Sequence, residues 1–251
     1  MKRPLVSPEE WAKFVRLLYS DRTGEHMEDT IRRFLKDHPD CVHRTSMQFT
    51  PLFYACQSNN ICLAKILLEL GANVNEGWVD FDGGSPLFAA AESGNVDAVQ
   101  LLIDHGVSIH SIMNYVIRNE KVFECGTTAL KTLLNVASDV DLETTWHDAE
   151  GEMVRGSYLH LALAEGSSLS ANLLLECGKF DVNALDSRGN SALLLAISNK
   201  LCNGLVKDIL RTTTDVEFAN SYGEYPLSLA TKRADINVIF ELLSAHPHLI
   251  C

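Results

Sequence analysis

The chain of 251 residues carries a formal net charge of −12, and 46% of its residues are hydrophobic. That hydrophobic share is ordinary for a folded protein, so disorder is not expected. The excess of carboxylates argues against a nucleic-acid partner, because nucleic-acid backbones are contacted by clustered Lys and Arg. The charge suits a basic protein partner, or it serves solubility alone.

The cysteines and the N-terminal residues indicate the compartment. No apolar run reaches the length needed to cross a bilayer, and the first residues, MKRPLVSPEEWAK, lack the apolar segment of a signal peptide. The seven cysteines are an odd number without regular spacing, which is typical of reduced, buried thiols. The sequence therefore predicts a cytoplasmic or nuclear protein that does not bind a membrane.

The first 43 residues predict a pair of helices. Ser7 and Glu10 form a capping box, with proline at the first helical position between them. Apolar residues then recur at helical spacing in two stretches: Trp11, Phe14, Val15 and Leu18, followed by Met27, Ile31, Phe34 and Leu35. We expect this pair, residues 7–43, to cover the N-terminal end of the fold that follows.

A stretch of about two helices' length occurs twice between Ser46 and His110. Thr50-Pro51-Leu52-Phe53 aligns with Ser85-Pro86-Leu87-Phe88, and Gly71-Ala72-Asn73-Val74-Asn75 aligns with Gly106-Val107-Ser108-Ile109-His110. Thr or Ser before proline is a helix start, and glycine after an apolar run is a helix end. Each copy therefore predicts two short antiparallel helices, which bury their apolar faces only by stacking on neighbours.

The spacing of Thr/Ser-Pro-Leu, Ala, Leu-Leu and Gly in these copies resembles that of the ankyrin repeat. The resemblance implies an all-α solenoid of stacked antiparallel helix pairs with β-hairpin-type connecting loops. It implies a single domain, 1–251, with an acidic insertion at 144–156 and repeats at 46–77, 82–110, 111–143, 157–185, 186–219 and 220–250. It also implies that His160 hydrogen-bonds between neighbouring repeats.

Two stretches depart from the family pattern, and both are acidic and aromatic. The connection EGWVDFDGG (76–84) is longer than usual, and the insertion TTWHDAEGEMVRG (144–156) lies among six carboxylates without Lys or Arg between Asp139 and Glu152. Exposed aromatic residues are typical interface anchors. We therefore predict an acidic, aromatic rim for a basic, apolar partner; the alternatives are a folded-back Trp78 and a merely solubilising loop. The rim comprises Trp78, Asp80, Phe81, Asp82, Trp146, Asp148 and Glu150.

Further candidate binding residues follow from the resemblance alone. Ankyrin repeats bind partners in a concave groove made of hairpins and first helices. The variable positions of that groove in this sequence are Met47, Phe49, Gln57, Ser58, Asp82, Glu92, Ser93, Glu165, Arg188, Asn190, Tyr222 and Glu224. Phe49 and Tyr222 are the predicted anchors. Asn75 and Asn183 occupy the position that asparaginyl hydroxylases modify in some ankyrin repeats; the alternative is an unmodified turn residue.

The sequence shows no pattern that predicts catalysis, a cofactor or a metal site. The nearest ligand pairs, Cys41-x-His43 and Cys56-x5-Cys62, lack a second pair at zinc-site spacing. We predict a non-catalytic adaptor or inhibitor that binds another protein and is monomeric when unbound. The alternatives are a structural subunit held through the apolar ends of the stack, and a secreted pathogen effector that binds a host protein. An enzyme would need a site that the sequence does not show.

Overall fold

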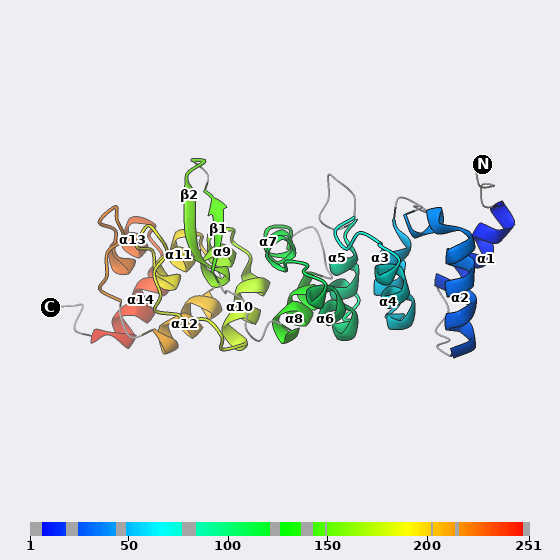
Figure 1. Ribbon diagram of the computed structural model, residues 1–251. Helices are drawn as coiled ribbons and strands as arrows, with labels where there is room; N and C mark the ends of the chain where they lie inside the picture. Colours follow the sequence, from blue (N-terminus) through cyan, green and yellow to red (C-terminus); the bar gives the residue numbers. More distant parts are fainter. Residues whose placement is uncertain are drawn as a thin grey trace. The chain divides into compact units, whose positions relative to one another are not determined.

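The computed structural model describes residues 7–18, 25–43, 49–76, 84–120, 126–136, 143–148, 150–201, 203–213 and 216–247. The chain divides into two compact units. Unit 1 comprises Met1–Val116 and Thr128–Ser138, and unit 2 comprises Ile117–Thr127 and Asp139–Cys251. Each unit consists mainly of short helices arranged in antiparallel pairs (Figure 1).

Unit 1 begins with the predicted helix pair and continues with the doubled stretch. Thr50 and Ser85 cap α3 and α5, because their hydroxyl oxygens accept the N–H groups of Phe53 and Phe88 at 3.2 and 3.1 Å. Its elements, of which α7 and α8 lie mostly in this unit, are α1 Pro8–Leu18, α2 Glu25–Asp37, the 3-10 helix η1 Pro39–Val42, α3 Pro51–Gln57, α4 Ile61–Glu69, α5 Pro86–Glu92, α6 Val96–Asp104, α7 His110–Arg118 and α8 Gly126–Val136.

Stacking between neighbouring pairs supplies the core of unit 1. The first helices α3 and α5 pack on each other, as do the second helices α4 and α6. Leu52 and Leu87, which follow the prolines, are fully buried in this stack. A polar clamp adds to it, since the Asn95 side-chain amide donates to the carbonyls of Cys56 and Gln57 at 2.9 and 2.7 Å. The clamp gives the Gln57 carbonyl a donor and adds a second donor to the Cys56 carbonyl, which also accepts the Asn59 N–H.

Unit 2 also consists of stacked helix pairs, and a two-stranded sheet precedes its first pair in the sequence. Figure 1 shows α9, α11 and α13 in one row and α10, α12 and α14 in another, with the strands projecting beyond the first row. Its elements are β1 Glu143–His147, β2 Met153–Ser157, α9 Tyr158–Ala164, α10 Ser168–Glu176, α11 Ala192–Ser198, α12 Asn203–Thr212, α13 Pro226–Lys232 and α14 Ile236–Ala245. The all-α prediction is thus confirmed as a mostly helical fold.

The acidic insertion at 144–156 stays a prediction, but the structure shows that these residues do not form an irregular loop. These residues lie in the antiparallel hairpin of β1 and β2, which leads directly into α9 through Ser157, the N-cap of that helix. A strand forms here because alternate side chains are buried on one face, namely Thr144, Trp146 and Val154, with Gly156 opposite Thr144. The segment is therefore a two-stranded hairpin that leads into α9. The single continuous domain and the boundaries of its repeats stay predictions.

The buried thiols carry a testable consequence. Cys41 and Cys56 are buried, and Cys62 and Cys177 are half-buried. Cys125, Cys202 and Cys251 lie outside the described residues. Burial raises the pKa of the Cys56 thiol to about 12. Because the thiolate is the reactive form, we expect Cys56 to resist iodoacetamide in the folded protein and to react once urea unfolds it. Peptide mass spectrometry measures this, with Cys62 as the more accessible comparison; equal labelling of both in the native protein would contradict it.

Candidate functional site

Three turns of unit 2 share one local structure. In each, the first residue is Asp or Asn, and its Oδ1 accepts the N–H groups two and four residues later. The third residue after it is a glycine with φ between +74° and +81°, a conformation that other residues adopt only with strain. These turns are 148–152, 186–190 and 220–224. We call them together the hairpin ridge.

Hydrogen bonds join the successive turns of the hairpin ridge. The Ser187 N–H donates to the Arg155 carbonyl at 2.7 Å, and the Arg155 N–H donates to the Ser187 hydroxyl at 3.0 Å. Ser221 repeats the contact one hairpin later, because its N–H and hydroxyl both donate to the Arg188 carbonyl, at 2.9 and 2.7 Å. In addition, the Asn220 amide donates to Asn190 Oδ1 at 3.0 Å. The turns are therefore held in register with one another.

Charged and aromatic side chains line this ridge. Arg188 forms an ion pair with Asp148 and lies 4.0 Å from a Glu150 carboxylate oxygen. Its guanidinium also lies 6.0 Å from the centre of the Tyr222 ring, at cation–π distance. Desolvation disfavours the Asp148 carboxylate, but the Glu152 N–H and the Arg188 charge hold the pKa of Asp148 below its ordinary value. Tyr222 is 66% exposed, so its ring is available to a partner.

His160 forms hydrogen bonds through both ring nitrogens, but both partners lie within the predicted repeat 157–185, so a bond between neighbouring repeats stays a prediction. Its Nδ1 accepts the Ser157 N–H at 3.2 Å, so its Nε2 carries the proton and donates to the Ala184 carbonyl of the next hairpin at 3.0 Å. The ring is buried, and burial lowers the pKa of His160 although the Ala184 carbonyl opposes this. His160 is thus a structural residue that ties α9 to the following hairpin.

A pH dependence of stability follows from this histidine. Because its pKa is lowered in the folded state, the unfolded chain takes up the proton first as the pH falls below 6.5, the ordinary value. The contribution of neutral His160 is therefore complete above that pH and is lost as the pH falls through the folded pKa. We expect the urea midpoint to drop less between pH 7.5 and 5 in His160→Gln, which keeps a capping-box side chain. An equal drop in both proteins would contradict the assignment.

The expectation that Trp146 is an exposed anchor is wrong. Its side chain is only 5% exposed, because the strand register places it on the buried face of the hairpin. Gly156 lies beneath it, and a Cβ at Gly156 would come within 3.1 Å of both the Trp146 ring and the Asp186 side chain. Trp146 therefore holds the hairpin against unit 2 and is not offered to a partner.

The other binding candidates in unit 2 lie in the turns of the hairpin ridge, except Glu165, which is the C-cap of α9. Glu150 is exposed, and Glu165 forms an ion pair with Arg118 at 3.0 Å. Asn190 donates to Asp186 at 2.9 Å, and Glu224 lies 3.4 Å from the Lys232 amine. Of the possible modification sites, Asn183 is exposed in unit 2 and Asn75 is exposed in unit 1. Their hydroxylation stays a prediction.

The candidates in unit 1 are only partly described. Phe49 is half-buried and stacks on Phe53, with 4.1 Å between ring centroids, so it supports α3 as well as facing solvent. Gln57 and Ser93 are exposed, whereas Ser58 and Glu92 are half-buried. The other candidates, Met47, Trp78, Asp80, Phe81 and Asp82, lie outside the described residues. The predicted rim that joins them to Asp148 and Glu150 stays a prediction.

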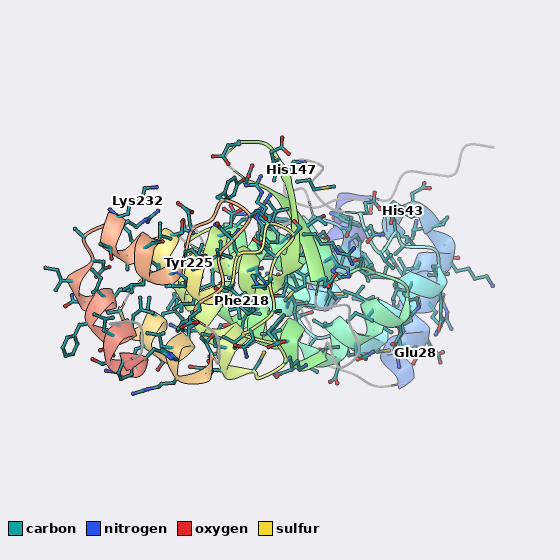
Figure 2. The ribbon with its side chains drawn as sticks, turned by 90° about the vertical axis from the view of Figure 1, so that its left-hand side faces the viewer. Glu28, His43, His147, Phe218, Tyr225 and Lys232 are labelled. Carbon is teal, nitrogen blue, oxygen red and sulfur yellow. The ribbon has the colours of Figure 1, made fainter. Side chains whose placement is uncertain are left out.

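Sequence reasoning missed the residues that build the ridge. Ser187 and Ser221 join the turns, and Asp186 and Asn220 organise them, yet none was a candidate. A signal was present, since Asp148-Ala-Glu-Gly151, Asp186-Ser-Arg-Gly189 and Asn220-Ser-Tyr-Gly223 share the pattern Asp/Asn-x-x-Gly. Two exposed aromatics near the ridge, Phe218 and Tyr225, were missed as well (Figure 2).

The described residues contain neither a metal-ligand cluster nor a membrane-spanning helix. Within the described residues, no three His, Cys, Asp or Glu side chains gather where they could hold a metal ion. In the same part of the chain, no helix has the length and apolar character that crossing a membrane requires.

Comparisons with known proteins agree with this architecture. A family model described as ankyrin repeats, in three copies, matches residues 22–113. An ankyrin repeat domain from Acinetobacter baumannii AYE covers 78% of this chain and 97% of its own, at 22% identity and a TM-score of 0.50. The ankyrin repeat domain of Bcl-3, a member of the IkappaB protein family, covers 78% of this chain and 86% of its own, at 21% identity and a TM-score of 0.56.

No curated protein matches the chain in sequence. The family model covers the doubled stretch from which the resemblance was inferred, and the solved structures share the fold of helix pairs and hairpins. Ankyrin repeat domains are in general protein-binding modules. Residues 22–113 therefore match the ankyrin-repeat family, and the chain has the fold of ankyrin repeat domains.

Proposed function

We propose that the chain acts as an adaptor or inhibitor that binds another protein through the hairpin ridge of unit 2 and the first helices beside it. The observation that carries the proposal is the pre-organised ridge, whose turns are joined by Ser187 and Ser221. A partner that contacts it orders few additional groups, so little of the binding energy is lost to ordering. Tyr222, which is held beside Arg188 and is largely exposed, is the proposed anchor.

The charge of the ridge indicates the chemistry of the partner. Its two basic side chains nearest the turns, Arg155 and Arg188, are already paired with Glu143 and Asp148. Glu150 and Glu152 remain exposed at the tip of the hairpin. The surface is therefore negative with an aromatic anchor, which suits a partner that presents Lys or Arg beside an apolar side chain.

A structural role in a larger assembly is a second candidate, favoured by α14. Ile236 and Phe240, one helical turn apart, are 77% and 70% exposed. On α13, Leu227 follows the proline as Leu52 and Leu87 do, yet it is only half-buried and lines an open cavity of about 660 Å³ with Tyr225 and Val216. This end of the unit thus resembles a stacking face that lacks a neighbour.

One pair of variants separates the two functions. Tyr222→Ala and Phe240→Ala each remove a single exposed aromatic ring, one from the ridge and one from α14. The partner captured from the native source by the wild-type protein is identified by mass spectrometry and then quantified with each variant. Loss with Tyr222→Ala alone supports binding at the ridge, and loss with Phe240→Ala alone supports the assembly role. Undiminished capture by both would contradict the two candidates together.

A further inference from the structure

The two edges of the β1–β2 hairpin differ in their hydrogen bonding. In an antiparallel pair, residues alternate between those that bond to the opposite strand and those whose N–H and C=O point outward. The N–H and C=O of Arg155 bond to Ser187 of the next hairpin, so they point outward from β2. The outward edge of β2 is therefore occupied at Arg155.

The same alternation leaves the edge of β1 open. Thr145 is the register partner of Arg155, and His147 is the partner of Met153. The backbone groups of Thr145 and His147 consequently point outward from β1, away from β2. Through the described part of the chain, no hydrogen bond engages these backbone groups. Both side chains are exposed as well, and Figure 2 shows His147 near the projecting end of the hairpin.

We propose that β1 accepts an extended, Lys- or Arg-rich segment of a partner protein as a third strand. The inference rests on the proposed function, since it names how that partner contacts the ridge. Two outward N–H and two outward C=O groups, at alternate residues, form the pattern that strand addition uses. The added strand would bond to the backbone of β1 as Ser187 bonds to the backbone of Arg155 on β2.

Charge decides in favour of a basic segment over an acidic one. Thr145 and His147 share their face of the hairpin with Glu143 and Arg155. The charges of Glu143 and Arg155 neutralise each other in an ion pair. The carboxylates of Glu150 and Glu152 are exposed at the turn next to His147. A strand laid along β1 passes these carboxylates, so Lys or Arg on its alternate residues is attracted and Asp or Glu is repelled.

The proposal is tested first on the unaltered protein. The probe is a synthetic peptide of alternating Thr and Lys, and its counterpart alternates Thr and Glu. In amide hydrogen exchange followed by NMR, we expect Thr145 and His147 to exchange fast in the free protein and to be protected by the Lys peptide only. Trp146, whose N–H faces β2, is protected with and without peptide. Absence of protection at Thr145 and His147 would overturn the proposal.

A variant removes the outward N–H without touching the bonds between β1 and β2. Thr145→Pro is tolerated on an edge strand because the lost N–H points outward, and Thr145→Val keeps that N–H and the strand propensity. Fluorescence anisotropy should show the labelled Lys peptide binding about tenfold more weakly to Thr145→Pro, with Thr145→Val near wild type. Equal losses in both variants would overturn strand addition. Should Thr145→Pro fail to fold by circular dichroism, the exchange experiment decides alone.

Two further outcomes separate this inference from the proposed function. If the native partner is lost with Tyr222→Ala but the Lys peptide leaves Thr145 and His147 unprotected, strand addition fails and binding at the ridge stands. If the free protein sediments as a dimer that Thr145→Pro dissociates, the edge pairs with a second copy of the chain, which overturns a basic segment as its occupant.

Discussion

Trp146→Ala is expected to lower the free energy of unfolding by about 3–5 kcal/mol, the range for truncating a buried aromatic side chain. Trp146 is 5% exposed and lies over Gly156. Its loss removes the apolar contact that holds the β1–β2 hairpin on the rest of unit 2. Urea unfolding followed by far-ultraviolet circular dichroism measures the effect.

The matched control for Trp146 lies on the same hairpin. Met153→Ala removes a large apolar side chain that is 68% exposed, on the opposite face. We expect its free energy of unfolding to stay within about 0.5 kcal/mol of the wild type. A Trp146→Ala protein as stable as Met153→Ala would show that the tryptophan does not hold the hairpin, and the anchor role would then be open again.

Asp186→Ala is expected to destabilise the protein by about 2–3 kcal/mol, because several donors lose a buried charged acceptor at once. Asp186 is 6% exposed, and its carboxylate accepts the N–H groups of Arg188 and Asn190 and the side-chain amide of Asn190. The turn that it organises carries Arg188, so binding at the ridge should weaken together with stability. Urea unfolding and capture of the partner measure the two effects.

Two comparison variants identify the cause of that loss. Asp186→Asn keeps an Oδ1 acceptor, and Asn220 shows that asparagine organises the same turn in the next hairpin; it should recover most of the stability. Asp181→Ala removes an exposed carboxylate that accepts one N–H, from Asn183 at 2.9 Å, and should cost less than about 1 kcal/mol. Similar losses for Asp181→Ala and Asp186→Ala would contradict a special role for the buried turn.

The elements whose signals are local in sequence were predictable. Thr50-Pro51 and Ser85-Pro86 start helices because the hydroxyl cap and the missing N–H of proline act within one turn. His160 could be singled out from the family resemblance, and the structure shows its hydrogen bond to the Ala184 carbonyl. For the same reason the helix pairs were predicted in every repeat, including the irregular one that contains α7 and α8.

The candidate site was predicted less well, because burial and exposure depend on what packs nearby. Trp146 stands among carboxylates in the sequence, which suggested a solvated loop, but its neighbours at alternate positions turn it inward. Conversely, Ser187 and Ser221 have no unusual neighbours in sequence, and their role arises only from the carbonyls of the preceding hairpin.

The sequence by itself therefore determined the repeat and the fold, since caps, turns and apolar spacing act over a few residues. Only the tertiary structure decided that the outward backbone groups of the β1–β2 hairpin are bonded at Arg155 and open at Thr145. The reason is physical: Arg155 and Thr145 both point their backbone groups outward, and stacking of the next hairpin satisfies those of Arg155 alone.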